Sequence, residues 1–251
     1  MILTYHEITH EPSPYVYSVS RAGFAKHLAW SRTREVRFTF DDGHASHFRH
    51  ALPLLHEAGA AGLFFITAGW TGVRPECMNW AQLKELSAAG QAIGSHGWTH
   101  ALLHACSPLT LRDELQRSKH VLEDRLGIPV DSISLPGGRG NQRVLDGCAE
   151  QGYTTVYTSD PFDAPGRRDT RVAGRFMVKR HTDEAGLADM LGSLGQPLSL
   201  LRIQHRAKRL LRRAIGDAGY QKLWSLAGSG EARTGINKAY GDVVEGREDA
   251  A

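Results

Sequence analysis

Apolar and polar positions switch repeatedly between two periods along the first 180 residues, which predicts strands alternating with helices. The strand-like runs lie at 35–40, 62–67, 91–97, 132–138, 153–159 and 171–180. Apolar residues at helical spacing predict helices at 44–57, 79–90, 110–127 and 141–152. Strands joined by helices through short connections run parallel, so this α/β pattern fits a barrel or a doubly wound sheet. No G-x-G-x-x-G follows the first strand, which disfavours the nucleotide-binding version.

The helix predicted over 110–127 has the clearest ends. Thr110 and Asp113 stand at the spacing of a capping box, and Gly127 is a common helix terminator.

The segment 198–215 has a different pattern, with six Lys or Arg residues set among Leu, Ile and Ala. Its apolar residues share one helical face, at Ile203, Ala207, Leu210, Leu211 and Ala214. We favour a terminal helix that packs this stripe on the main domain and leaves its basic face in water. The alternative is a basic amphipathic helix in peripheral contact with an anionic membrane surface. The end of the chain, 229–251, is rich in Gly, Ala and charge and is expected to be disordered.

Composition narrows the class of protein. The chain has 251 residues, of which 41% are apolar and 23% charged, as in ordinary globular proteins. A net charge of +3 gives no support to nucleic-acid binding. The three cysteines form no C-x-x-C pair, and their odd number fits a reducing compartment. The first residues do not resemble a signal peptide and no apolar run has the length of a membrane span, so we expect a cytoplasmic protein, either free or at the inner face of the membrane.

Two pairs of polar residues follow predicted strand ends. Asp41 and Asp42 come directly after the run 35–40, and His96 and His100 lie in the sequence SHGWTH. An Asp-Gly pair is also common in plain turns, and an i, i+4 histidine pair alone is often structural. Together, however, both pairs fall at the carboxyl ends of parallel strands, which is the catalytic face of a barrel. Two histidines and one carboxylate suit zinc or iron(II), and a second carboxylate beside them can serve as general base.

These residues carry a resemblance to a known family. TFDDG at 39–43 and SHGWTH at 95–100 resemble the first two motifs of the polysaccharide deacetylases with a NodB-homology domain, and ILTYHEI at 2–8 resembles their first strand. The resemblance covers about residues 1–180. The basic pattern described above predicts a helical extension over 196–228, after a main domain at 1–195. The resemblance implies a distorted (β/α) barrel of about seven strands for that domain. It also implies that Asp41 is the general base and that Asp42, His96 and His100 bind a divalent metal, most often zinc.

The later motifs of that family match less well. In SLPGG, at 134–138, Ser134 stands where the family has an arginine that orients the catalytic aspartate, and Gly137 stands where it has an aromatic residue. The backbone N–H of Gly137 can still bind an oxyanion, and Arg139 can replace the arginine only if its loop folds back.

The family's histidine general acid has no counterpart in frame. His181 is the nearest candidate for that acid by position, although it suits an exposed loop equally well. His44 and His47, directly after the paired aspartates, are the alternatives.

The resemblance implies a metal-dependent N-deacetylase that hydrolyses the acetamide of an N-acetylated sugar in a glycan, glycolipid or sugar-nucleotide precursor. Two alternatives remain open. One is a non-sugar C–N hydrolase on the same barrel, and the other is a catalytically degenerate barrel that binds a glycan.

Overall fold

A single main sheet organises the computed structural model, which describes residues 1–10, 13–163 and 170–227. Its eight strands pair in parallel in the order β10-β1-β4-β5-β6-β7-β8-β9. They are β1 (Ile2–Tyr5), β4 (Arg37–Phe40), β5 (Gly62–Ile66), β6 (Ala92–Ser95), β7 (Ser132–Ser134), β8 (Thr155–Thr158), β9 (Arg171–Gly174) and β10 (Phe176–Met177). A separate two-stranded sheet pairs β2 (Glu7–Thr9) with β3 (Ser18–Ser20).

The two edge strands of the main sheet are consecutive in the chain, and Arg175 alone separates them. Strand β9 pairs with β8, whereas β10 pairs with β1, so the chain crosses at Arg175 from one end of the sheet to the other. The sheet is therefore a nearly closed barrel, which confirms the expected distorted (β/α) barrel. The single strand expected over 171–180 is split in two, and this accounts for eight strands where about seven were expected.

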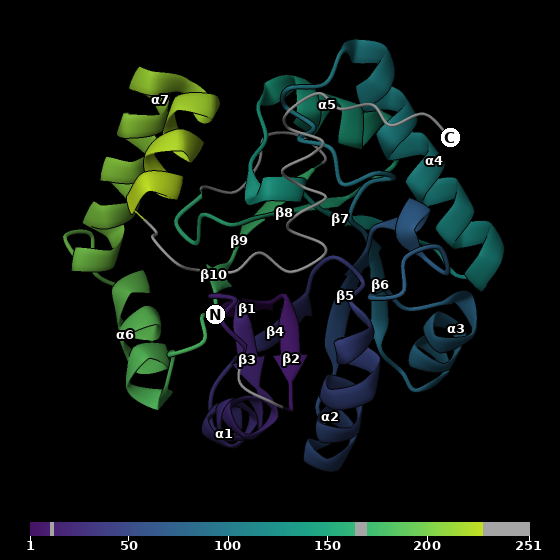
Figure 1. Cartoon of the computed structure of the whole chain (residues 1–251), viewed down its shortest axis with the longest axis horizontal. Helices are drawn as coiled ribbons and strands as arrows, with labels where there is room; N and C mark the ends of the chain where they lie inside the picture. The colour runs from purple at the N-terminus through teal and green to yellow at the C-terminus, as the bar shows by residue number, and fades with distance from the viewer. Residues whose placement is uncertain (11–12, 164–169, 228–251) are drawn as a thin grey trace.

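Helices surround this barrel in Figure 1, with α6 and α7 together at one side of it. They are α1 (Arg21–Ser31), α2 (Leu52–Ala58), α3 (Trp80–Ala88), α4 (Pro108–Leu126), α5 (Gln142–Glu150), α6 (Glu184–Leu194) and α7 (Leu200–Ala227). No helix in the described part of the chain is long and apolar enough to cross a membrane. The expected disordered tail, 229–251, lies outside the described residues.

Two local details differ from the predictions. Helix α4 begins earlier than expected, because the Ser107 side chain accepts the backbone N–H of Thr110 at 3.1 Å and so caps the helix in place of the Thr110–Asp113 pair. The helix expected over 44–57 starts as a π-helical turn at His47–Ala51 before α2. Pro53 has no backbone N–H to donate to Arg49, which is consistent with a wider turn ending just before it.

The alternation of side chains along β4 separates the apolar core from the polar interior of the barrel. Phe38 and Phe40 face outward and meet Phe24 of α1, with ring centroids 5.9 and 5.7 Å apart. Thr39 faces the other way, and its hydroxyl lies 2.6 Å from the hydroxyl of Thr4 in β1. The barrel interior at this level is thus lined by polar groups, directly below the end of β4 that carries the paired aspartates.

Candidate active site

Asp41 and Asp42 occupy the point where the chain leaves β4. The N–H of Asp41 donates to the carbonyl of Tyr5 at 3.0 Å, which extends the pairing of β4 with β1 by one residue. Asp42 then turns the chain with a φ of 72°. Among the described residues, only Asp42 and His100 combine a side chain with a positive φ. Each such position costs roughly 1–3 kcal/mol of backbone strain, and strain of this kind gathers at functional sites.

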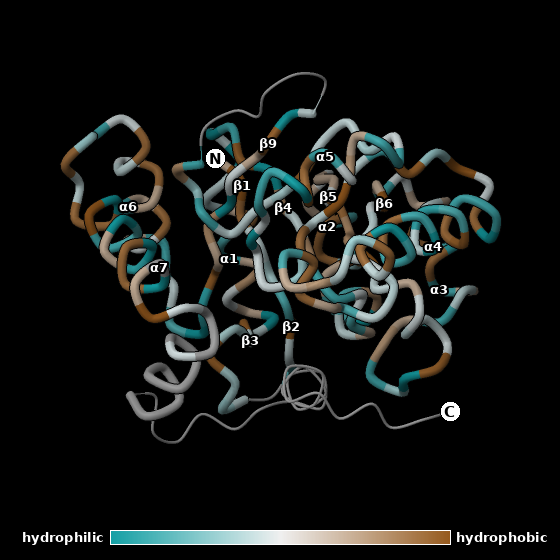
Figure 2. The backbone as a smooth tube through the Cα atoms, turned by 90° about the horizontal axis from the view of Figure 1, so that it is seen from above, coloured by the Kyte–Doolittle hydropathy of each residue, from teal (hydrophilic) through white to brown (hydrophobic). Residues whose placement is uncertain are grey.

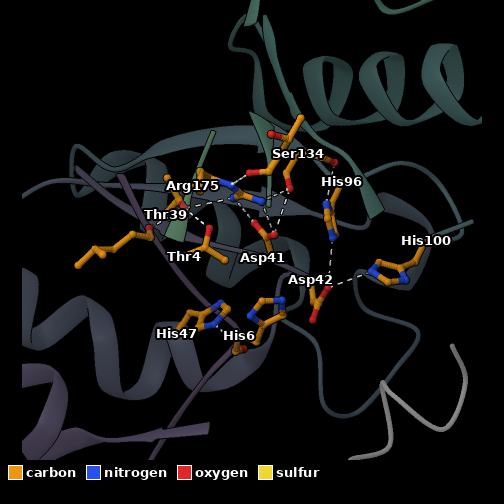
Figure 3. Close-up of polar contacts among 12 residues, drawn as sticks. Thr4, His6, Thr39, Asp41, Asp42, His47, His96, His100, Ser134 and Arg175 are labelled. Carbon is orange, nitrogen blue, oxygen red and sulfur yellow. Dashed lines mark hydrogen bonds and ion pairs between the residues drawn. The ribbon is translucent and has the colours of Figure 1, made fainter. Parts of the chain in front are cut away.

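The same two strained residues belong to one cluster with His96. The Nε2 atoms of His96 and His100 lie 3.3 and 3.2 Å from Oδ1 of Asp42, as Figure 3 shows. The three ligand atoms all lie within 4.8 Å of one another, and no other such group of three was found in the described residues. The predicted metal ligands are therefore brought together, from the ends of β4 and β6.

The donor atoms of this cluster are prepared for a metal ion. Nδ1 of His96 lies 2.8 Å from the carbonyl of Ser134, and this contact orients the ring so that Nε2, which bonds Asp42 in the metal-free structure, can bind an ion once it releases its proton. Burial acts to raise the pKa of Asp42, but hydrogen bonds from His100 and His96 outweigh it and hold the pKa well below its usual value. Two imidazole nitrogens and one ionised carboxylate fit a divalent ion such as Zn²⁺ or Fe²⁺.

A buried carboxylate on α4 holds the loop that carries His100. Glu114 is 3% exposed, and its carboxylate accepts the backbone N–H of Trp98 at 2.8 Å and that of Thr99 at 3.0 Å. It also accepts the Thr99 hydroxyl. A Cβ on Gly97 would lie 3.1 Å from this carboxylate, and Gly97 has a φ of 79° that disfavours other residues. The charge of Glu114 therefore fixes the turn between the two histidines.

Asp41 is bound on its other side by Arg175. The guanidinium donates to both carboxylate oxygens, at 2.7 and 2.8 Å, and also to the Ser134 hydroxyl at 2.8 Å. That hydroxyl in turn donates to Asp41 at 3.0 Å. Arg175 has no exposed surface. Burial acts to raise the pKa of Asp41, but the Arg175 charge outweighs it and, with His96, lowers the pKa to about 2. Asp41 is thus an ionised, oriented carboxylate at neutral pH.

The family resemblance predicts an orienting arginine at position 134. In the structure Arg175 supplies that guanidinium, from the junction of β9 and β10. Arg139, the replacement considered from the sequence, lies beside His104, whose pKa is lowered by burial and further by the Arg139 charge. Ser134 still contributes its hydroxyl to the Asp41 network. Asp41 is thus held from two elements. Ser134 on β7 contributes a hydroxyl, and Arg175 at the β9–β10 junction contributes the guanidinium.

His6 is a site residue that the sequence analysis did not single out. It follows β1 directly and is half-buried, and Figure 3 places its ring beside Asp42. No hydrogen-bond partner for its Nδ1 was found in the described residues. Burial lowers the pKa of His6, and the charges of Asp42 and Asp41 oppose this effect. The sequence does place His6 directly after the first strand, at the same barrel edge as Asp41, and this position could have indicated a site residue.

The three histidines named from the sequence as general-acid candidates bond partners outside the Asp41–Asp42 cluster. His181 is exposed, and its ring accepts a hydrogen bond from Arg180 rather than from a site residue. His47 is fully buried against Phe40 and its Nε2 bonds the carbonyl of His6 at 2.8 Å. His44 bonds Ser46 through Nδ1 at 2.7 Å. These contacts give His44 and His47 a role in supporting the loop beneath the site.

Gly137 lies in the turn after β7, where its φ of 69° suits glycine. It is exposed, whereas its neighbour Gly138 is buried so tightly that a Cβ would lie 2.1 Å from the Ser159 hydroxyl oxygen. The Gly-Gly pair therefore lets this turn pass close to the segment that follows β8. Gly137 is the member of the pair whose backbone faces solvent.

Comparison with known proteins agrees with this fold and site. The family model for polysaccharide deacetylases matches residues 31–156, which is half of the chain, and the chain belongs to that family. YxkH of Bacillus subtilis (strain 168) is 29% identical over 126 residues, covering 50% of this chain and 45% of YxkH. A chitooligosaccharide deacetylase of Bradyrhizobium sp. (strain ANU 289) is 27% identical over 136 residues, covering 53% of this chain and 60% of the relative. The matched region thus spans about half the length of these relatives.

Solved structures show the same fold. The Streptococcus pyogenes deacetylase PplD, in complex with acetate, superposes with a TM-score of 0.66 at 21% identity, covering 74% of this chain and 95% of PplD. IcaB from Ammonifex degensii gives a TM-score of 0.63 at 24% identity, covering 75% of this chain and 94% of IcaB. The barrel is therefore that of the deacetylase family.

Proposed function

We propose that this protein is a divalent-metal-dependent N-deacetylase that releases acetate from an N-acetylated sugar. The observation that carries the proposal is the juxtaposition of two differently held carboxylates. Asp42 converges with His96 and His100 on one point, whereas Asp41 is paired with Arg175 and stays ionised next to them. This division separates a metal ligand from a general base.

Asp42, His96 and His100 are the residues that would hold the ion, and zinc is the metal we expect. The bound ion would lower the pKa of water and polarise the acetyl carbonyl. Glu114 and the Ser134 carbonyl hold the two histidines in place, through the 97–100 loop and through Nδ1 of His96 respectively.

Asp41 takes the proton from the attacking water. Its low pKa keeps it ionised, and the bidentate contact with Arg175 fixes the direction of its free lone pairs. The N–H of Gly137 donates to the oxygen that becomes negative in the tetrahedral intermediate, as backbone amides do in other acyl-transfer sites. A glycine suits this position because of its positive φ.

His6 gives a proton to the leaving amine. It is half-buried beside Asp42, and its Nδ1 has no hydrogen-bond partner among the described residues. Burial lowers the pKa of His6, so the ring must first take up a proton, and its protonated form is then a strong acid toward the departing nitrogen. His6 therefore replaces His181 as our candidate for the general acid.

The substrate class rests on the family and on the relative named a chitooligosaccharide deacetylase. Of the alternatives considered from the sequence, a degenerate binding barrel would have no need for a strained Asp42 and His100 or for an ionised Asp41. A non-sugar amide substrate is a further outcome of the test.

The test measures acetate release from N-acetylated chitin oligosaccharides, sugar nucleotides and glycolipids, with added zinc or cobalt and again after chelation. We expect release from at least one carbohydrate, its loss on chelation and its recovery when metal is restored. Asp42→Asn should abolish release, whereas Asp124→Asn, at an exposed position of α4, should not. Release that survives chelation, or a chain that binds metal and hydrolyses only non-sugar amides, would overturn the proposal.

A further inference from the structure

The outward face of α7 is apolar. Most of the large apolar side chains exposed in the described residues lie between Leu194 and Ile215. We define the α7 stripe as five of them that share one face of the helix, namely Leu200, Ile203, Leu210, Leu211 and Ile215. Leu200 is 71% exposed and Leu210 is 65% exposed, so the described part of the chain leaves both largely uncovered. Brown segments along α6 and α7 mark this region at the side of the barrel in Figure 2.

The polar face of α7 is the one that packs on the barrel. His205 and Arg209 lie 3.6 and 3.4 Å from the carboxylate of Asp160, in the segment that follows β8. The guanidinium of Arg202 lies 4.3 Å from the ring centroid of Phe162. The favoured sequence prediction, with the apolar stripe inward, was therefore wrong. The segment after β8, on which α7 packs, presents carboxylates and an aromatic ring. These groups attract cationic side chains more than aliphatic ones.

Charge decides which partner suits the exposed stripe. The segment 198–215 contains six Lys or Arg residues and no Asp or Glu. Arg206 is exposed, and the side chain of Arg209 is 44% exposed despite its contact with Asp160. A second copy of this chain, seated on the stripe, would bring like charges together. An anionic lipid surface instead offers negative headgroups to the basic residues and an acyl boundary to the aliphatic ones.

We propose that the α7 stripe and its flanking basic residues dock this protein on the surface of an anionic membrane. The apolar side chains enter the headgroup boundary while arginines at the margin contact lipid phosphates. The helix breaks at Gly216, where φ is 70°, so the docking surface is confined to the turns before that residue.

The helix that carries this surface is linked to the site through the segment on which its polar face packs. The segment that receives α7 follows Thr158, whose carbonyl accepts a hydrogen bond from Nε of Arg175 at 3.3 Å. A docked protein is therefore held at the lipid surface by a helix that packs on the segment leading to the Arg175–Asp41 pair. If the proposed function is right, such a placement suits an N-acetylated glycan carried on a lipid, although docking itself does not depend on activity.

The test is flotation of the full chain with two kinds of vesicle, one of phosphatidylcholine alone and one in which about a third of the lipid is phosphatidylglycerol. We expect binding to the anionic vesicles only, and weakening as salt is raised, because screening shortens the reach of surface charges. The double variant Leu200→Ser/Leu210→Ser should lose at least tenfold in vesicle affinity. The matched control is Val73→Ser/Leu109→Ser, since these side chains are 77% and 81% exposed elsewhere on the surface. The control should bind as the parent chain does.

Three results would overturn the docking proposal. The first is no binding of the full chain to anionic vesicles, and the second is equal binding by both double variants. The third is a dimer in light scattering that the α7 stripe variant dissociates, which would assign the stripe to a second copy. Acetate release from a soluble oligosaccharide should be the same in both double variants. Failure of docking and failure of the proposed activity are thus read by separate measurements.

Discussion

Arg175 and Asp41 form a buried bidentate ion pair, although 134 residues separate them in the chain. Arg175 is the single residue between β9 and β10, where the barrel nearly closes. Asp41 directly follows β4, which only β1 separates from β10 in the sheet. The closure of the fold and the orientation of the proposed base therefore depend on the same side chain.

Replacing Arg175 should alter the pH dependence of the reaction. Arg175→Met leaves the burial of Asp41 unopposed, so the Asp41 pKa rises and the carboxylate is lost as pH falls. We expect kcat/KM to drop about 10²-fold or more near neutral pH, with the acid limb of the pH profile moved upward. Arg175→Lys keeps the charge but not the bidentate contact. Its acid limb should therefore lie at lower pH than that of Arg175→Met.

Arg171→Met is the control for that series, since Arg171 is exposed at the start of β9. A variant that merely unfolds would lose activity at every pH, which circular dichroism detects. An unchanged acid limb in folded Arg175→Met would show that Arg175 does not set the Asp41 ionisation.

Removing Asp42 should abolish metal binding. Asp42→Ala takes away the carboxylate whose Oδ1 lies 3.3 and 3.2 Å from the Nε2 atoms of His96 and His100. We expect loss of bound zinc or cobalt by elemental analysis after gel filtration and a fall in activity of about 10³-fold or more, because an incomplete ligand set binds weakly. Stoichiometric metal in Asp42→Ala would place the ion elsewhere.

Comparison of His6→Gln with His181→Gln should identify the general acid. His6 lies beside Asp42 and His181 is exposed. We expect His6→Gln to lower kcat by about 10²–10⁴-fold, the usual effect of one acid–base group, while metal content stays the same. His181→Gln should remain within about twofold of the parent enzyme, given the small effect of most exposed substitutions. The opposite ranking would restore His181 as the acid.

Glu114 is a positioning residue, and its removal should weaken metal binding without touching a ligand. Glu114→Gln keeps the size of the side chain but loses the charge that accepts the N–H groups of Trp98 and Thr99. We expect metal affinity to fall about 10–100-fold, as for other groups that orient metal ligands. The neighbouring Asp113→Asn, exposed on α4, is the control. Activity of Glu114→Gln should recover at higher metal concentration, a response that general destabilisation would not give.

The sequence by itself determined the alternation of strands and helices, because the period of apolar residues reflects the geometry of each element. It also located Asp41, Asp42, His96 and His100 at strand ends, and the parallel order of β4, β5 and β6 then brings them to one edge. These residues were predictable because each pair is closely spaced in the sequence and directly follows a strand.

Only the tertiary structure decided the partner of Asp41, the place of His6 and the direction of α7. Arg175 meets Asp41 because the barrel closes, and no local pattern encodes a contact across its seam. His6 and Asp42 come together through the pairing of β1 with β4, which hydropathy alone does not specify. The stripe on α7 was visible in the sequence. Its outward direction depends on Asp160 and Phe162, which contact the polar face of the helix.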